Sequence, residues 1–124
     1  MKKQIFCVLM FASLASCRWY DYDNRNTDIS YSEGSHYYSM KAHFNKNKTR
    51  KVDNYMDERI GDRSNMSFVN TRIAGQIALD DHTIFYIKKY PGFLEIKFDK
   101  GENSYESYQR IKAMCLGIKE VIAR

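Results

Sequence analysis

The residues that could support acid–base, nucleophilic or metal chemistry are few and widely spaced in this chain of 124 residues. His36, His43 and His82 lack a second histidine four residues away and a cysteine or acid at a metal-ligand spacing. No serine lies in a Gly-x-Ser-x-Gly setting, and the glycines form no phosphate-binding or dinucleotide-binding motif. The adjacent carboxylates of Asp80 and Asp81 are typical of a solvated turn. The sequence therefore predicts a protein that is not an enzyme and holds no metal.

Cys17 is the one residue whose surroundings indicate a defined modification. Lys2 and Lys3 precede an apolar run, residues 5–14, which has the length of the core of a cleavable export signal. This run is too short to cross the hydrocarbon core of a membrane. The small residues that follow can enter a peptidase cleft in extended form, and the thiol of Cys17 is the atom that would be alkylated.

The four residues that end this segment, Leu14-Ala15-Ser16-Cys17, resemble the lipobox of bacterial lipoproteins. The resemblance implies that residues 1–16 are a signal peptide and that the mature chain begins at Cys17. The only added group would then be a covalent lipid on Cys17, with palmitate among its acyl chains, which anchors the protein to a membrane of the cell envelope. Arg18, in place of an aspartate, implies the outer membrane by the sorting rule of Gram-negative lipoproteins. The periplasmic and the surface-facing sides both stay open, as does cleavage by the ordinary signal peptidase.

Residues 17–35 are predicted to form a flexible tether that starts at the lipidated cysteine. They lack apolar periodicity and are rich in Asp, Asn, Ser and Gly, a composition that buries too little surface to order a chain. The alternative is that Tyr20, Tyr22 and Tyr31 dock on the folded domain or on a partner.

Residues 36–124 are predicted to form a single, small α+β domain with two layers. Residues with a period of two alternate with residues at helical spacing. The predicted order is β-α-β-β-β-α, with strands at 37–44, 71–79, 83–90 and 93–98 and helices at 49–60 and 104–122. The short turns at residues 80–82 and at Pro91-Gly92 predict an antiparallel three-strand meander. We expect the first strand to join this meander and both helices to pack on one face of the sheet.

Local signals define the ends of the helices. Thr49 is a plausible N-cap of the first helix and Gly61 its stop. Asn103 and Glu106 resemble a capping box at the start of the second helix. Gly117 lies inside that helix at a cost of about 1 kcal/mol relative to alanine. We therefore expect a close crossing of another element at this glycine.

Cysteine content and charge restrict the environment of the domain. Cys7 leaves with the signal and Cys17 is lipidated, so Cys115 stays alone on the apolar stripe of the last helix and is predicted to be a buried, inert thiol. The basic residues behind the formal charge of +5 are expected to keep the protein soluble or to face anionic surfaces of the envelope. The α-β-β-β-α order is also that of double-stranded-RNA-binding domains, but the helix starts lack their clustered lysines. Export also removes the ligand, so no nucleic acid is expected.

One face of the meander is predicted to be apolar and to meet the helices. The other face would carry Tyr86, Lys88, Phe93, Glu95 and Lys97, a mixture of charged and aromatic residues that is typical of protein-binding surfaces. The alternative is an ordinary solvated face. Two functions fit these features. The first is a non-catalytic, membrane-anchored protein-binding module, such as an inhibitor or an immunity protein against an envelope-acting toxin or hydrolase. The second is a structural or assembly factor of the outer membrane. A small-ligand carrier is a third.

Overall fold

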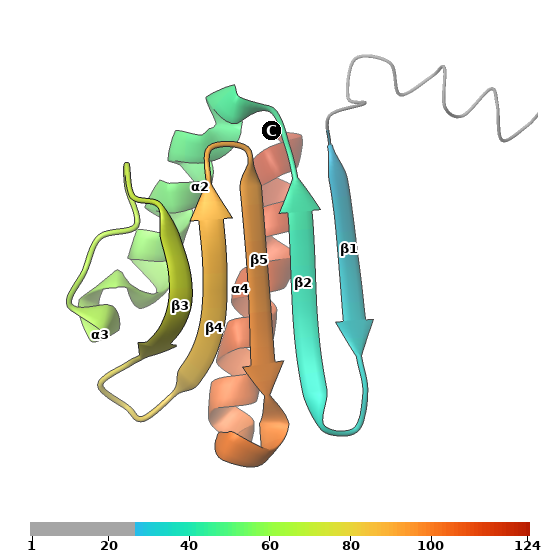
Figure 1. The fold of residues 1–124 in the computed structure, drawn as a ribbon, viewed down its shortest axis with the longest axis vertical. Helices are drawn as coiled ribbons and strands as arrows, with labels where there is room; N and C mark the ends of the chain where they lie inside the picture. Colours follow the sequence, from blue (N-terminus) through green and yellow to red (C-terminus); the bar gives the residue numbers. More distant parts are fainter. Residues whose placement is uncertain (1–26) are drawn as a thin grey trace, which may run out of the picture.

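A computed structural model describes residues 27–124, which form an α+β fold of one antiparallel sheet and helices packed on one of its faces (Figure 1). The five strands lie in the order β1-β2-β5-β4-β3. The predicted signal peptide, the lipobox-like residues with Cys17 and the first part of the predicted tether lie outside the described residues. The strands are β1 (Asp28–Glu33), β2 (Tyr37–His43), β3 (Ile73–Ala78), β4 (Ile84–Tyr90) and β5 (Phe93–Asp99). The helices are η2 (Lys46–Lys48), α2 (Thr49–Met56), η3 (Asp57–Gly61), α3 (Asp62–Ser64), η4 (Lys100–Glu102) and α4 (Tyr105–Ala123).

The predicted meander is present as β3, β4 and β5, which pair antiparallel in sequence order. The first predicted strand, β2, pairs antiparallel with β5, and the helices that follow β2 and β5 cover the same side of the sheet (Figure 1). The alternation of buried and exposed residues along β4 and β5 explains this arrangement, because one face of each strand is apolar.

The prediction of a flexible tether is wrong for residues 28–33, which form strand β1 at the edge of the sheet beside β2. Ile29 and Tyr31 pack against the core, and the hydroxyl of Tyr31 donates to the carbonyl of Cys115 at 3.2 Å. These two apolar residues alternate with polar ones. The backbone pairing with β2 supplies the ordering that the composition of the segment alone could not indicate.

The first helix begins at Thr49 as predicted, but its predicted N-cap and its predicted stop at Gly61 are wrong. Asn45 caps the short helix η2, Lys48 occupies the N-cap position of α2, and the Thr49 hydroxyl accepts a hydrogen bond from the Gly92 N–H at 2.9 Å. Gly61 keeps right-handed helical geometry, so the chain continues through η3 and α3 to Asn65, whose φ of 58° ends the helical run.

The last helix begins one residue later than a capping box at Asn103 would require. The hydroxyl of Ser104 accepts from the N–H of Ser107 at 3.1 Å, which makes Ser104 the N-cap. The expected close crossing at Gly117 is present, because a Cβ there would lie 1.8 Å from the Tyr55 hydroxyl of α2. A larger residue at position 117 would displace this tyrosine.

The core fills the space between the sheet and the helices. Its largest fully buried side chains come from every layer: Phe68, Phe85, Phe98, Met40, Met56, Ile60, Ile87, Leu94, Ile96, Ile111, Met114 and Ile118. Cys115 is buried among them as a free thiol, as predicted.

One charged pair also lies in this core. The ammonium of Lys89 on β4 and the Oδ1 atom of Asp53 on α2 are 3.4 Å apart, and both side chains are 3% exposed. Lys89 also donates to the carbonyl of Thr71. Burial raises the pKa of the Asp53 carboxyl, against the lowering effect of Lys89. The pair therefore ties the sheet to the first helix at a desolvation cost.

Candidate functional site

The sheet face that carries no helices is called here the open face. It is built from alternate residues of the three central strands: Tyr37, Ser39, Lys41 and His43 of β2, Phe93, Glu95, Lys97 and Asp99 of β5, and Ile84, Tyr86, Lys88 and Tyr90 of β4. Because successive strand residues point to opposite sides of a sheet, these residues share one face. The helices lie behind this face in the view of Figure 1.

All five residues predicted to form a binding face lie on the open face. The register pairs Tyr86 with Lys97, and Lys88 with Glu95. The ammonium of Lys97 lies 5.5 Å from the centre of the Tyr86 ring, a cation–π geometry. The structure thus brings together residues from two strands that a sequence pattern could place only by assuming a register.

Phe93 departs from the prediction because it is largely covered rather than offered to solvent. Its ring stacks on Tyr90 with centroids 4.8 Å apart, and the ring of His43 tilts against it at 4.9 Å. Only 7% of Phe93 is exposed, so Tyr90 and His43 present the accessible aromatic surface at this end of the face.

The open face has an excess of positive charge at its centre. Glu95 is the only acid there, and its Oε2 atom lies 3.9 Å from the Lys41 ammonium and 4.0 Å from that of Lys97. Lys88 faces Glu95 across the strands but forms no ion pair with any described residue. The lysines of these pairs are more than half exposed, so each pair stabilises the fold little. Three lysines against one glutamate leave a surface that suits an anionic partner.

Sequence reasoning left several residues of this face out of the predicted site, among them the exposed Tyr37, Lys41 and Tyr90. Tyr37 is 47% exposed and Tyr90 is 38% exposed, at opposite ends of the face. The alternation in residues 37–44 already separates Tyr37 and Lys41 from the core side. The missing information was that β2 lies directly beside β5, which no local pattern specifies.

Two shallow hollows lie on this face. One is lined by Tyr37, Ser39, Tyr86 and Lys97 together with Gln76 of β3. The other lies at the opposite end and is lined by His43, Lys46, Tyr90, Gly92 and Asp28. Both are open to solvent, and their mixed polar and aromatic lining suits side chains of a macromolecular partner better than an enclosed small molecule.

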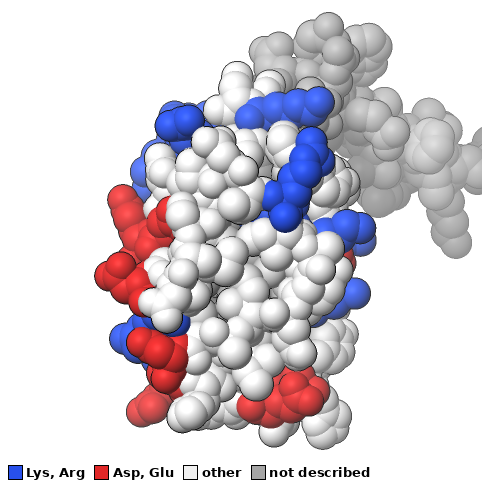
Figure 2. Space-filling model, turned by 60° about the vertical axis from the view of Figure 1, so that its left-hand side comes forward, with Lys and Arg blue, Asp and Glu red and all other residues white. Residues whose placement is uncertain are grey.

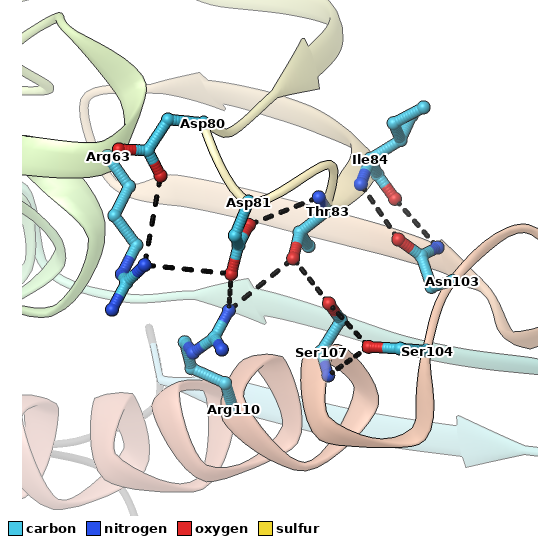
Figure 3. Close-up of polar contacts among 9 residues, drawn as sticks. All are labelled: Arg63, Asp80, Asp81, Thr83, Ile84, Asn103, Ser104, Ser107 and Arg110. Carbon is cyan, nitrogen blue, oxygen red and sulfur yellow. Dashed lines mark hydrogen bonds and ion pairs between the residues drawn. The ribbon is translucent and has the colours of Figure 1, made fainter.

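A second polar cluster links the β3–β4 turn to α4 (Figure 3). Arg110 donates to Asp81, and the hydroxyls of Thr83 and Ser107 lie 2.5 Å apart in a buried contact. Burial acts to raise the pKa of the Asp81 carboxyl, but hydrogen bonds from Thr83 and Arg110 outweigh it and lower this pKa. Arg63 lies 3.7 Å from Asp80 and 3.8 Å from Asp81.

The contacts of this cluster connect the β3–β4 turn to α4 (Figure 3). Asn103 closes the cluster, because its amide accepts from the Ile84 N–H at 2.8 Å and donates to the Ile84 carbonyl at 3.0 Å. The predicted solvated turn at Asp80 and Asp81 is thus only half right, since Asp81 is held by α4.

Glu33 holds β1 against η4 and α4 through three donors. Lys100 lies 2.8 Å from its carboxylate and Lys112 lies 3.1 Å from it, and the hydroxyl of Tyr108 donates to it. The hydrogen bonds from Lys100, Tyr108 and Lys112 lower the pKa of Glu33 to about 2. This cluster explains how an edge strand of polar composition is fixed to the domain.

Two properties of residues 27–124 concern the predicted absence of a metal site and the predicted anchoring to a membrane. No group of three His, Cys, Asp or Glu side chains in this range could hold a metal ion, and His36, His43 and His82 are all exposed. None of the helices in the same range is long and apolar enough to cross a membrane. Comparison with known proteins identifies no matching family model, no matching curated protein and no matching solved structure.

Proposed function

We propose that the chain is a lipid-anchored protein of the cell envelope, without catalytic activity, that binds a partner protein through the open face. The observation that carries this proposal is the surface formed by Lys41, Lys88 and Lys97, with exposed tyrosines at its two ends. Aromatic residues combined with positive charge are enriched at protein interfaces. No described helix covers this face (Figure 1).

The chemistry of the face suits a partner with an acidic patch. Lys88 has no ion-pair partner among the described residues, so a carboxylate of a partner would meet a charge that is not already neutralised. Electrostatic complementarity of this kind speeds association and selects the partner, while the aromatic rings contribute buried area. An acidic envelope-acting toxin or hydrolase that is blocked in this way fits the inhibitor or immunity role.

Basic residues at the end of the domain where β1 begins support a membrane attachment at that end. Lys46, Lys48, Arg50 and Lys51 lie around the start of α2 at the same end, where Figure 2 shows basic residues gathered. Cys17 lies ten residues before the first described residue. A short tether from a lipid on Cys17 would let these basic residues approach an anionic envelope surface.

A structural or assembly factor of the outer membrane is the second candidate, and the same anchor and face would serve it. A small-ligand carrier has less support, because packed side chains fill the space between the sheet and the helices. The binding module is distinguished from the assembly factor by stoichiometry: one tight partner for the first, and several weak partners for the second.

The proposal is tested by comparing what three forms of the full, tagged chain retain from solubilised envelopes at matched expression. The first is wild type, the second carries Tyr86→Ala, Lys88→Glu and Lys97→Glu. The control, Arg59→Glu with Lys119→Glu, reverses two exposed charges on the helices. We expect one stoichiometric protein with wild type and with the control, and its loss with the open-face variant. Equal retention by all three forms would contradict the proposal.

The anchor is tested separately with Cys17→Ala. We expect this change to abolish palmitate labelling and to release the protein from membranes, because the thiol is the acceptor of the lipid. A variant that stays with the membrane fraction would refute the lipoprotein assignment and leave the assignment of the open face untouched.

A further inference from the structure

The charged residues of the domain are divided between the two ends of its long axis. At one end β2 and β4 finish and β1, β3 and β5 begin. The helices η2 and α2 start at the same end (Figure 1). This end is called here the basic end, after the residues around the starts of α2 and β3: Lys46, Lys48, Arg50, Lys51 and Arg72.

The positive charges of the basic end are not neutralised within the domain. All of its five basic residues except Lys48 are exposed, and none of the five forms an ion pair within residues 27–124. Lys48 donates to the carbonyl of Arg124 at 2.5 Å, which brings a further basic residue to this end. Asp28 and Glu120 add acidic groups here, but positive charge stays in excess.

The opposite end carries an excess of acidic residues, and its basic residues are already engaged. Arg63 lies 3.7 Å from Asp80, Arg110 donates to Asp81, and Lys100 lies 2.8 Å from Glu33. Figure 2 shows basic residues at the top of the molecule and acidic residues lower down, along the left and at the base. This end is called here the acidic end, after Glu33, Asp80, Asp81, Asp99, Glu102 and Glu106.

The chain that leads from Cys17 enters the domain at the basic end. Asp28, the first residue of β1, pairs with His43, the last residue of β2, shortly before η2 begins. Thr27 follows Cys17 by ten residues, and a chain of this length spans at most about 35 Å even when fully extended. A lipid on Cys17 would therefore hold the basic end as the nearer end to a bilayer.

An exposed tyrosine stands at the corner between the basic end and the open face. Tyr90 is 38% exposed, and Pro91 beside it is exposed in the turn between β4 and β5. Tyrosine is enriched where a bilayer meets water, because its ring is apolar and its hydroxyl is polar. Tyr90 shares a hollow with Lys46 and His43, so an aromatic ring and a basic side chain lie together at this corner.

We propose that the basic end rests on the phosphate-bearing headgroups of an anionic bilayer, and that the domain stands with its acidic end away from the membrane. Lysine and arginine side chains near such a surface each add to the attraction, which decays within a Debye length of about 8 Å at physiological salt. The same surface repels the acidic end, so the charges at both ends favour one orientation.

This orientation has a consequence for the open face. The strands run from one end of the domain to the other, so the open face stands upright on the bilayer and stays accessible to a partner (Figure 1). The contact is reversible and sensitive to salt, so it orients the domain but does not replace an anchor. The orientation therefore rests on the lipid anchor proposed for Cys17, while it does not depend on what the open face binds.

The proposal is tested with the full, lipid-anchored chain in two kinds of vesicle, phosphatidylcholine alone and equimolar phosphatidylcholine and phosphatidylglycerol. A fluorescent label is placed on Asn47→Cys at the basic end or on Glu102→Cys at the acidic end, and a quencher attached to lipid headgroups reports which label lies near the bilayer. Both positions are exposed, whereas Cys115 is buried. We expect quenching at position 47 only in the anionic vesicles, its loss at high salt, and no quenching at position 102.

The basic residues are tested by reversing their charges in the Asn47→Cys background. The first variant carries Lys46→Glu, Arg50→Glu and Lys51→Glu. The matched control carries Arg59→Glu, Lys88→Glu and Lys97→Glu, which change the net charge equally at exposed positions away from the basic end. We expect the first variant to lose the quenching and the control to keep it. The thermal midpoint of each variant shows whether its fold is kept.

The outcomes separate the contact from the anchor. Equal quenching at position 47 in neutral and anionic vesicles, quenching at position 102, or equal quenching of the two charge variants would each overturn the proposal. Flotation of the chain with vesicles but without quenching at position 47 would refute the contact and leave the anchor standing. Failure to float with either kind of vesicle would refute the anchor at Cys17 and the orientation with it.

Discussion

The buried pair of Lys89 and Asp53 gives the sharpest prediction about what holds the two layers together. We consider Lys89→Met, which keeps the length and the apolar stem of the side chain but removes its charge. The Asp53 carboxylate would then stay 3% exposed, and its Oδ1 atom, which accepts no hydrogen bond from a described residue, would lose the ammonium at 3.4 Å. The carbonyl of Thr71 would lose its donor as well.

The expected cost follows from these losses. Removing one partner of a buried ion pair typically costs about 3–5 kcal/mol, because a desolvated charge remains without compensation. We expect a cost in this range for Lys89→Met, and a similar one for Asp53→Ala, which leaves the ammonium unpaired. Replacing both residues removes both buried charges, so the double variant should lose only about 1–3 kcal/mol, less than either single variant.

The measurement is equilibrium unfolding in urea of the wild type, the two single variants and the double variant, at the same pH and salt concentration. The difference between the double variant and the sum of the single variants gives the coupling free energy of the pair. We expect a coupling of several kcal/mol. If the double variant instead loses the sum of the two single costs, the two residues do not interact and the reasoning is refuted.

Three further predictions concern residues that join other parts of the fold. Because Lys100, Tyr108 and Lys112 lower the pKa of Glu33 from 4.5 to about 2, its stabilising effect should be complete above pH 4.5 and disappear as the pH falls toward 2. The thermal midpoints of wild type and Glu33→Gln should therefore differ near neutral pH and converge in acid; a constant difference would argue against the assignment. Burial raises the pKa of the Cys115 thiol to about 12, so a maleimide should label this thiol only after the protein unfolds. Cys115→Ala should lower the free energy of unfolding by about 1–2 kcal/mol without affecting partner binding. Asn103→Ala removes two hydrogen bonds to the Ile84 backbone and should lower the free energy of unfolding in urea by about 2–3 kcal/mol. Asn54→Ala, at an exposed position, should lower it by less than half as much. Equal losses from the two substitutions would rule out a structural role for the Asn103 amide.

Much of the fold could be predicted because apolar residues repeat with clear periods. The alternation in residues 83–98 and the short turn at Pro91-Gly92 specified two strands and their antiparallel pairing. The stripe of Ile111, Cys115 and Ile118 specified the buried side of the last helix. These signals are local, and each depends on residues that are close in the sequence.

The features that could not be predicted depend on contacts between distant residues. Strand β1 has only two apolar residues, and it is ordered by pairing with β2 and by Tyr31 and Glu33 contacts to α4. Asn103 was expected to cap a helix, but its amide instead bonds to the backbone of Ile84. Such partners lie outside the range that a local pattern can report.

The candidate site was predicted in part for the same reason. Alternation was enough to place Tyr86, Lys88, Glu95 and Lys97 on one face. It could not reveal that Lys41 adds a third lysine beside Glu95, because this depends on β2 lying next to β5. The positive excess of the face is therefore a property of the sheet order rather than of any one strand.

The central claim, that the open face binds a partner protein, is tested most directly by photo-cross-linking in intact cells. A photoreactive phenylalanine analogue is introduced in the full chain at Lys88 on the open face, and in separate chains at Ala113 and Leu116, which are exposed on α4. Our account predicts a discrete cross-linked product with one other protein from position 88, and none from positions 113 and 116. A product from the α4 positions alone, or none from position 88 in correctly folded protein, would contradict it.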